Sequence, residues 1–195
     1  MTTAAQHATI SLSFDYQQRN QQLSWHAVED GHNARHSHGP HAGGMWFDPG
    51  TQVDVLVTGG TVEETLSQSL GFSIVQCCIV TRPHAYDLTR NLGRQFAPPS
   101  PFEAPHGLVA AVVTVTDFQP ERATPDAAGL LYFGRAYRSA QPLTVAGAAA
   151  GQAFLHRWEM SFVLTVQIVD ERSGARTLRV FTYDPETEVG NGMNS

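Results

Sequence analysis

The sequence contains no lysine, and all twelve of its basic residues are arginine. Without an ε-ammonium group, the chain cannot be a Schiff-base enzyme or use a lysine-dependent phosphate loop. Charge of either sign is also scarce, at 15% of 195 residues, and the net charge is −6 with a pI near 5.8. Scattered arginines on an acidic chain lack the basic footprint of a nucleic-acid-binding protein, so we expect no nucleic-acid partner.

Cysteine and long apolar runs are equally sparse. The only two cysteines, Cys77 and Cys78, are adjacent, and a disulfide between neighbours in a strand would be strained. This excludes a secreted scaffold held together by disulfides. The longest apolar runs, near Leu108–Val113, are far shorter than the roughly 20 residues of a membrane-spanning helix. The segment Met1–Phe14 has neither the basic nor the apolar region of a signal peptide. We therefore expect a cytoplasmic protein, with export by a leaderless route left open.

Alternation of apolar and polar side chains, the pattern of half-buried β-strands, is abundant. In the first such segment, Ile10, Leu12 and Phe14 share one face. The segment Phe72–Thr81 is apolar on both faces, which predicts a central strand covered on both sides. The segments that we expect to form strands are Ala8–Phe14, Leu23–Ala27, Gln52–Thr58, Phe72–Thr81, Gly107–Phe118, Leu130–Arg138, Met160–Val169 and Arg176–Tyr183.

About eight or nine strands separated by Gly, Pro and Asp clusters predict an all-β fold, an antiparallel β-sandwich of jelly-roll or immunoglobulin-like complexity. Ser173-Gly174 is a good hairpin turn between the last two long strands. The helix signals are a single turn at Asp87–Leu92 and two turns at Thr61–Ser69, where Thr61 and Glu64 have capping-box spacing. We expect one domain over residues 1–195, with long loops at 29–44, 82–106 and 139–152.

The most distinctive local feature is a histidine cluster in the first of these loops. Its four members are His32, His36, His38 and His41. Imidazole is the commonest metal ligand, so this glycine-containing loop is a candidate site for zinc, nickel or copper. His36 and His38 would also share one side of a strand, as in cupin-type metal enzymes, but no glutamate follows at a suitable spacing. The plainer interpretation is a solvated loop that binds metal only adventitiously.

Other chemical motifs are absent from the sequence. There is no Gly-x-Ser-x-Gly nucleophile elbow, and no glycine-rich phosphate loop follows a strand and opens a helix. Three tryptophans, Trp25, Trp46 and Trp158, would suit a sugar-binding platform, although core or sheet-edge positions explain them more simply. We therefore name no catalytic and no cofactor-binding residues.

The C-terminal stretch Trp158–Asn191 contains an aromatic-led strand, a short polar turn, and a second strand that ends on Tyr183-Asp184-Pro185. In this order of elements, and in overall length, the chain resembles the PixA/AidA group of small bacterial inclusion-body proteins. The resemblance covers about a fifth of the chain. It implies an all-β fold, no catalytic residues and a tendency to assemble or accumulate.

Three functional hypotheses follow. The first is a non-enzymatic β-sandwich that self-associates, in a structural, storage or accessory role, because few charges protect its sheet edges from pairing. The second is a metal-binding protein or metal-dependent enzyme that uses the histidine loop. The third is a small-ligand or carbohydrate-binding module with an apolar pocket. We favour the first and expect a homo-oligomer or larger assembly.

Overall fold

The computed structural model describes residues 6–29, 32–33, 44–83, 100–103, 112–122, 133–146, 156–183 and 186–189. These residues form two sheets, of seven and six strands, and one short helix, α1 (Glu64–Ser67). The seven-stranded sheet, sheet A, contains β1 (His7–Asp15), β2 (Ser24–Glu29), β3 (His32–Asn33), β5 (Gln52–Thr61), β8 (Phe118–Glu121), β9 (Phe133–Ser139) and β10 (Leu143–Thr144). The six-stranded sheet, sheet B, contains β4 (Met45–Phe47), β6 (Leu70–Pro83), β7 (Val112–Val115), β11 (His156–Asp170), β12 (Arg176–Tyr183) and β13 (Glu186–Val189).

Both sheets are mostly antiparallel, and the prediction of an all-β fold is confirmed. Sheet A runs β3-β2-β1-β5-β9-β8, with β10 also paired to β5. Sheet B runs β4-β13-β11-β6-β7, with β12 also paired to β11. Two neighbouring pairs, β1 with β5 and β4 with β13, are parallel, which the expectation of a wholly antiparallel fold did not anticipate.

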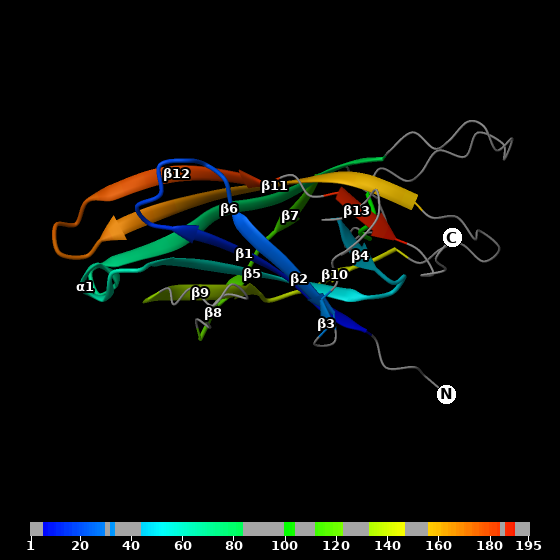
Figure 1. The fold of residues 1–195 in the computed structure, drawn as a ribbon, viewed down its shortest axis with the longest axis horizontal. Coiled ribbons are helices and arrows are strands. Elements are labelled where there is room, and N and C mark those ends of the chain that lie inside the picture. Colours follow the sequence, from blue (N-terminus) through cyan, green and yellow to red (C-terminus); the bar gives the residue numbers. More distant parts are fainter. Residues whose placement is uncertain are drawn as a thin grey trace, which may run out of the picture.

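The alternating segments place their apolar side chains between the two sheets, which lie one above the other in Figure 1. The burial of β1 alternates strictly along its length, as its sequence predicts. Rings from the two sheets meet in the middle, where Phe14 of β1 stacks on Phe181 of β12 with 4.7 Å between centroids. The buried cluster draws on both sheets, and burial of this apolar area is the main stabilising contribution.

The segment Gly107–Phe118, expected to form one strand, departs from that prediction within its described part. β7 pairs with β6 in sheet B, and β8 pairs with β9 in sheet A. Between them Asp117 adopts a left-handed conformation, with φ of 56°, which aspartate tolerates better than most residues. The chain thus changes sheets at Asp117.

The predicted capping box is wrong. Thr61 is buried as the last residue of β5, and α1 begins only at Glu64. The cap residue is Glu63, which makes no side-chain capping bond. Strand pairing with β9 holds Thr61 in an extended conformation, so it cannot start the helix.

The three predicted loops contain some regular structure where the structure describes them. β3 lies within 29–44, and β10 lies within 139–152. Phe102, within 82–106, is fully buried and forms an isolated bridge with Val145. The expected helical turn at Asp87–Leu92 lies outside the described residues. No helix in the described part of the chain is long and apolar enough to cross a membrane.

Candidate functional site: the outer face of sheet B

The histidine cluster is only partly within the described residues. His32 lies in β3, at the edge of sheet A opposite Glu29, whereas His36, His38 and His41 lie outside the described ranges. Among the residues with defined positions, no three His, Cys, Asp or Glu side chains are grouped to hold a metal ion. The zinc, nickel or copper site in this loop therefore stays a prediction.

The tryptophans do not form an exposed platform where the structure describes them. Trp158 is buried at 2% exposure, and Trp25 is half-buried with its ring 5.0 Å from that of Tyr183. The side chain of Trp46 lies outside the described set. Two of the three candidates thus pack into or against the core.

Two buried titratable groups also belong to the interior. Cys77 faces inward from β6, and burial raises the pKa of its thiol to about 12. The Tyr16 side chain is also buried, which raises the pKa of its hydroxyl. Both groups are therefore neutral at physiological pH, and neither is activated as a nucleophile or a base. Both cysteines are free, as their adjacent positions predict.

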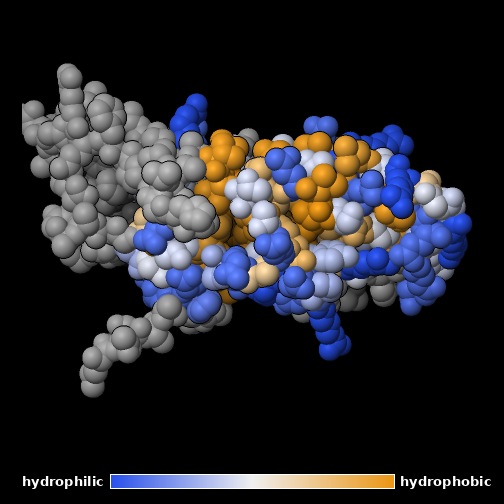
Figure 2. All heavy atoms as spheres, turned by 180° about the vertical axis from the view of Figure 1, so that it is seen from behind, coloured by the Kyte–Doolittle hydropathy of each residue, from blue (hydrophilic) through white to orange (hydrophobic). Residues whose placement is uncertain are grey.

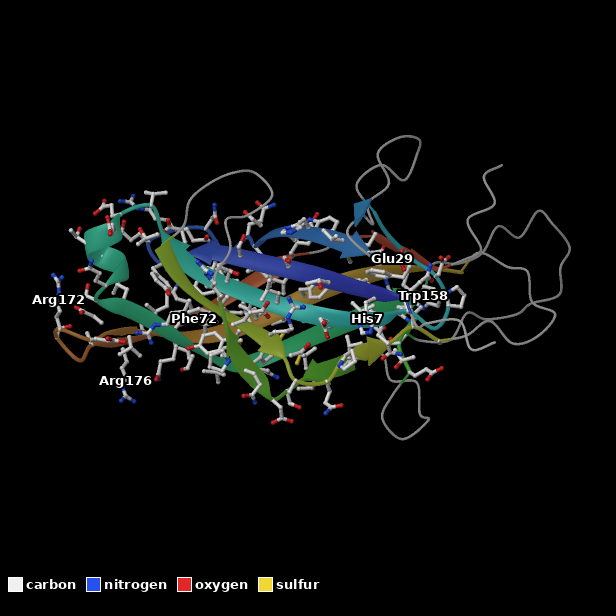
Figure 3. The ribbon with its side chains drawn as sticks, turned by 90° about the horizontal axis from the view of Figure 1, so that it is seen from below. His7, Glu29, Phe72, Trp158, Arg172 and Arg176 are labelled. Atoms are coloured by element: carbon white, nitrogen blue, oxygen red, sulfur yellow. The ribbon has the colours of Figure 1, made fainter. Side chains whose placement is uncertain are left out.

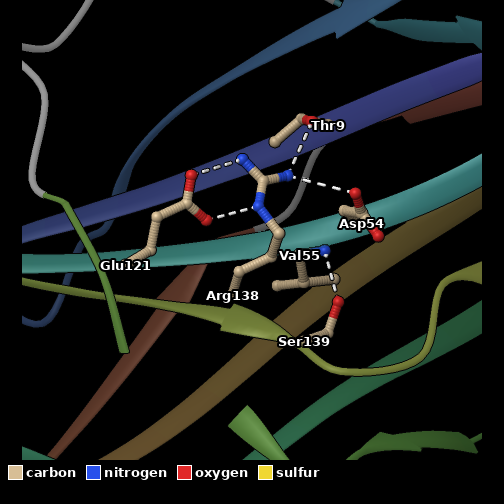
Figure 4. Close-up of polar contacts among 6 residues, drawn as sticks. All are labelled: Thr9, Asp54, Val55, Glu121, Arg138 and Ser139. Carbon is tan, nitrogen blue, oxygen red and sulfur yellow. Dashed lines mark hydrogen bonds and ion pairs between the residues drawn. The ribbon is translucent and has the colours of Figure 1, made fainter. Parts of the chain in front are cut away.

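The outer face of sheet A is polar and internally paired. Arg138 of β9 donates to the carboxylates of Asp54, at 3.1 Å, and Glu121, and to the hydroxyl of Thr9 at 3.2 Å. These partners come from β5, β8 and β1, so one guanidinium links four strands across the face (Figure 4). A surface of this kind is satisfied in water and needs no covering partner.

The outer face of sheet B has the opposite character. Where side chains are described, six large hydrophobic ones are exposed, and five of these lie in its strands: Val75, Val80, Val112, Leu178 and Val180. Their exposed fractions run from 38% for Val80 to 61% for Leu178. Seen from behind in Figure 2, hydrophobic residues gather in the upper half of the molecule, where Figure 1 places β6, β7, β11 and β12. We call this outer surface of β12, β11, β6 and β7 the apolar face.

Strand register makes these side chains neighbours. Val80 lies opposite Val112 on β7 and opposite Ser161 on β11. Val163 of β11 lies between Cys78 of β6 and Thr182 of β12. Between these positions the outward side chains are small or uncharged, as at Thr165 and Gln167. The four strands therefore form one uncharged surface on which apolar side chains lie beside small or uncharged polar ones.

Charged groups mark the ends of the apolar face. At one end Arg82 of β6 forms an ion pair with Glu159 of β11. At the other end lies Arg176, and Figure 3 shows it beside Arg172 at the opposite end of the molecule from Trp158. Each end therefore carries arginine, while the middle has no charge to repel a second apolar surface.

The apolar face explains a sequence pattern that was misread. The apolar residues on both faces of Phe72–Thr81 predict a strand covered on both sides, but in the described part of the chain only the inner face of β6 packs into the core, and Val75 and Val80 on its outer face are exposed. Val75 lies at a bulge opposite the step from Thr165 to Val166 and is 58% exposed. The sequence shows the outward apolar residues of β6 but not that they stay on the surface.

No family model matches the chain, and neither the curated proteins nor the solved structures include one that is similar to it. The resemblance to the PixA/AidA family therefore stays a prediction.

Proposed function

We propose that the protein is a self-associating, non-enzymatic structural or accessory protein of inclusion-body type, whose chains pack together through the apolar face of sheet B. The observation that carries the proposal is that β6 presents Val75 and Val80 on its outer side, where the described part of the fold leaves them 58% and 38% exposed. A contiguous exposed apolar surface on a soluble domain marks an interaction site.

A second copy of the chain fits this surface. Two apolar faces brought together by a two-fold axis bury valine against valine, and each face supplies the same uncharged surface. At the end that carries Arg82 the charge does not oppose this arrangement, because Arg82 is already paired with Glu159. The polar face of sheet A has its charges paired within the chain and remains towards water.

The area available is modest. At about 16 Å² of sheet per residue position, the four strands of the apolar face present roughly 600 Å². A stable interface buries about 800 Å² on each partner. Packing of single faces therefore predicts weak, concentration-dependent association.

The test compares two arginine substitutions at matched exposure. Val75→Arg places a charge in the apolar face at a side chain that is 58% exposed. Val62→Arg makes the same change at a side chain that is 61% exposed, just beyond β5 and outside sheet B. Sedimentation equilibrium over the micromolar to millimolar range measures the association constant of each variant and of the unsubstituted protein.

The unsubstituted protein and Val62→Arg should associate alike. Val75→Arg should weaken association on the order of tenfold or more, because it buries an unpaired charge. Thermal unfolding of both variants checks that the folded state is retained. A protein that stays monomeric throughout the range, or equal association of the two variants, would overturn the proposal.

A further inference from the structure

The edge of sheet B formed by β12 has backbone groups that its own sheet does not use. The N–H of Asp170 donates to the carbonyl of Ala175 at 2.9 Å, so residue 175 and every second residue after it face β11. The intervening residues Arg176, Leu178, Val180 and Thr182 direct their N–H and C=O groups away from β11.

Among the described residues, hydrogen-bond partners cover only the last of these outward positions. The N–H of Thr182 donates to Gln21, and its carbonyl accepts from Leu23, at 2.7 and 3.1 Å. Within the described part of the chain, no hydrogen bond is formed by the backbone groups of Arg176, Leu178 or Val180. Three N–H and three C=O groups are therefore available along residues 176–180, which is the form of an open strand edge.

We propose that this edge pairs with β12 of a second copy, antiparallel and in a register that places Leu178 opposite Leu178 of the other chain. The free edge has three outward positions and Leu178 is the middle one, so a two-fold axis there pairs Arg176 with Val180 and satisfies all six groups on each chain. On the inner side this register places Thr177 opposite Arg179. A shift of the axis to Arg179 would bring two arginines face to face, which disfavours it.

Edge pairing enlarges the apolar face that is available for packing, and this part of the inference rests on the proposed function. Residues directly opposite in an antiparallel pair have side chains on the same side, so the outer faces of the two copies become one surface. That surface has roughly 1,200 Å² of sheet, twice the single face. It exceeds the 800 Å² or so that a stable interface needs on each partner. The assembly unit is then an edge-paired dimer that stacks through its joined apolar faces.

Cysteine cross-linking tests the register. Leu178→Cys should form a disulfide-linked dimer under mild oxidation, because directly opposed Cα atoms lie about 5.5 Å apart, within disulfide range. Thr177→Cys is a control on the same strand. In this register the Cα atoms of the two Thr177 residues lie farther apart than the roughly 7 Å limit for a disulfide. Val62→Cys is a second control, because Val62 and Leu178 are both 61% exposed. The readout is the dimer fraction on non-reducing gels, with at least tenfold more for Leu178→Cys than for either control.

A proline variant gives a readout without added thiols. Leu178→Pro removes an N–H that points away from β11, so the hairpin keeps its hydrogen bonds. It should leave the melting temperature within a few degrees and weaken association on the order of tenfold or more. Equal cross-linking of the three cysteine variants, or unchanged association of Leu178→Pro, would overturn the edge inference. The edge inference and the proposed function can fail separately. If only the edge inference is wrong, Val75→Arg still dissociates chains that pack through their apolar faces. If edge-paired dimers form and tolerate Val75→Arg, only the proposal about the apolar face is contradicted.

Discussion

The hydroxyl of Ser139 accepts a hydrogen bond from the backbone N–H of Val55, at 3.0 Å. On this side of β5, β9 pairs with Leu56 and the residues after it, and β10 pairs with Val53 and Gln52. Val55 lies in the gap between these two strands, and the side chain of Ser139, the last residue of β9, fills it (Figure 4). One hydroxyl thus completes the pairing of a strand whose inward residues Val53, Val55 and Val57 are fully buried.

Ser139→Ala should therefore lower the free energy of unfolding by about 1–3 kcal/mol, because it leaves a buried N–H without an acceptor. Ser173→Ala is the matched control, since Ser173 is exposed in the turn before β12 and its hydroxyl contacts Asp170. Denaturant titration of both variants measures the difference. An equal, small effect of the two substitutions would contradict the role given to Ser139.

Gly134 of β9 should not tolerate a side chain. A Cβ there would lie 2.0 Å from the carbonyl oxygen of Gly59 and 2.6 Å from the Cα of Gly60, both backbone atoms of β5. Because backbone cannot swing aside, Gly134→Ala should destabilise the fold by about 3 kcal/mol or more. Gly174→Asn, in the left-handed turn with open space around it, should cost less than about 1 kcal/mol. Melting temperatures compare the two, and a well-folded Gly134→Ala protein would show that β5 and β9 are not this close.

The ion pair between Glu121 and Arg138 should contribute to stability in a pH-dependent way. A hydrogen bond from Arg138 lowers the pKa of the Glu121 carboxyl below its usual value of about 4.3. Because the pKa of Glu121 is lowered in the folded state, the ion pair contributes fully to stability above the usual pKa of glutamate. This contribution is lost as the pH falls through the lowered pKa of the folded state. Both side chains are about one-third exposed, so the contribution should stay below about 1 kcal/mol.

Glu121→Gln should therefore be less stable than the unsubstituted protein at neutral pH, and the difference should shrink as the pH falls below about 4. Glu63→Gln provides the control, because Glu63 is exposed and has no ion pair among the described residues. Denaturation at a series of pH values measures both differences. A difference for Glu121→Gln that stays constant down to pH 3 would contradict the assignment.

The strand assignments came directly from the sequence because alternation is a local property. Ile10, Leu12 and Phe14 share one face in the sequence and in the core, and the turn at Ser173-Gly174 joins β11 and β12 as expected, with Gly174 at a φ of 71°. Other expectations failed where distant segments compete for the same residues. Thr61 has the spacing of a helix cap, but pairing with Phe133 of β9 keeps it in a strand.

The sequence by itself determined the all-β class, most of the strands and the inward side of the alternating ones, because two-residue alternation and turn residues act over a few positions. Only the tertiary structure decided that β1 runs parallel to β5, that the chain changes sheets at Asp117, and which stripe of β6 stays uncovered. The physical reason is that pairing and covering are made by segments far apart in the chain. Val75 and Ile79 look alike in the sequence, and only the packed sheets show that one is half exposed and the other fully buried.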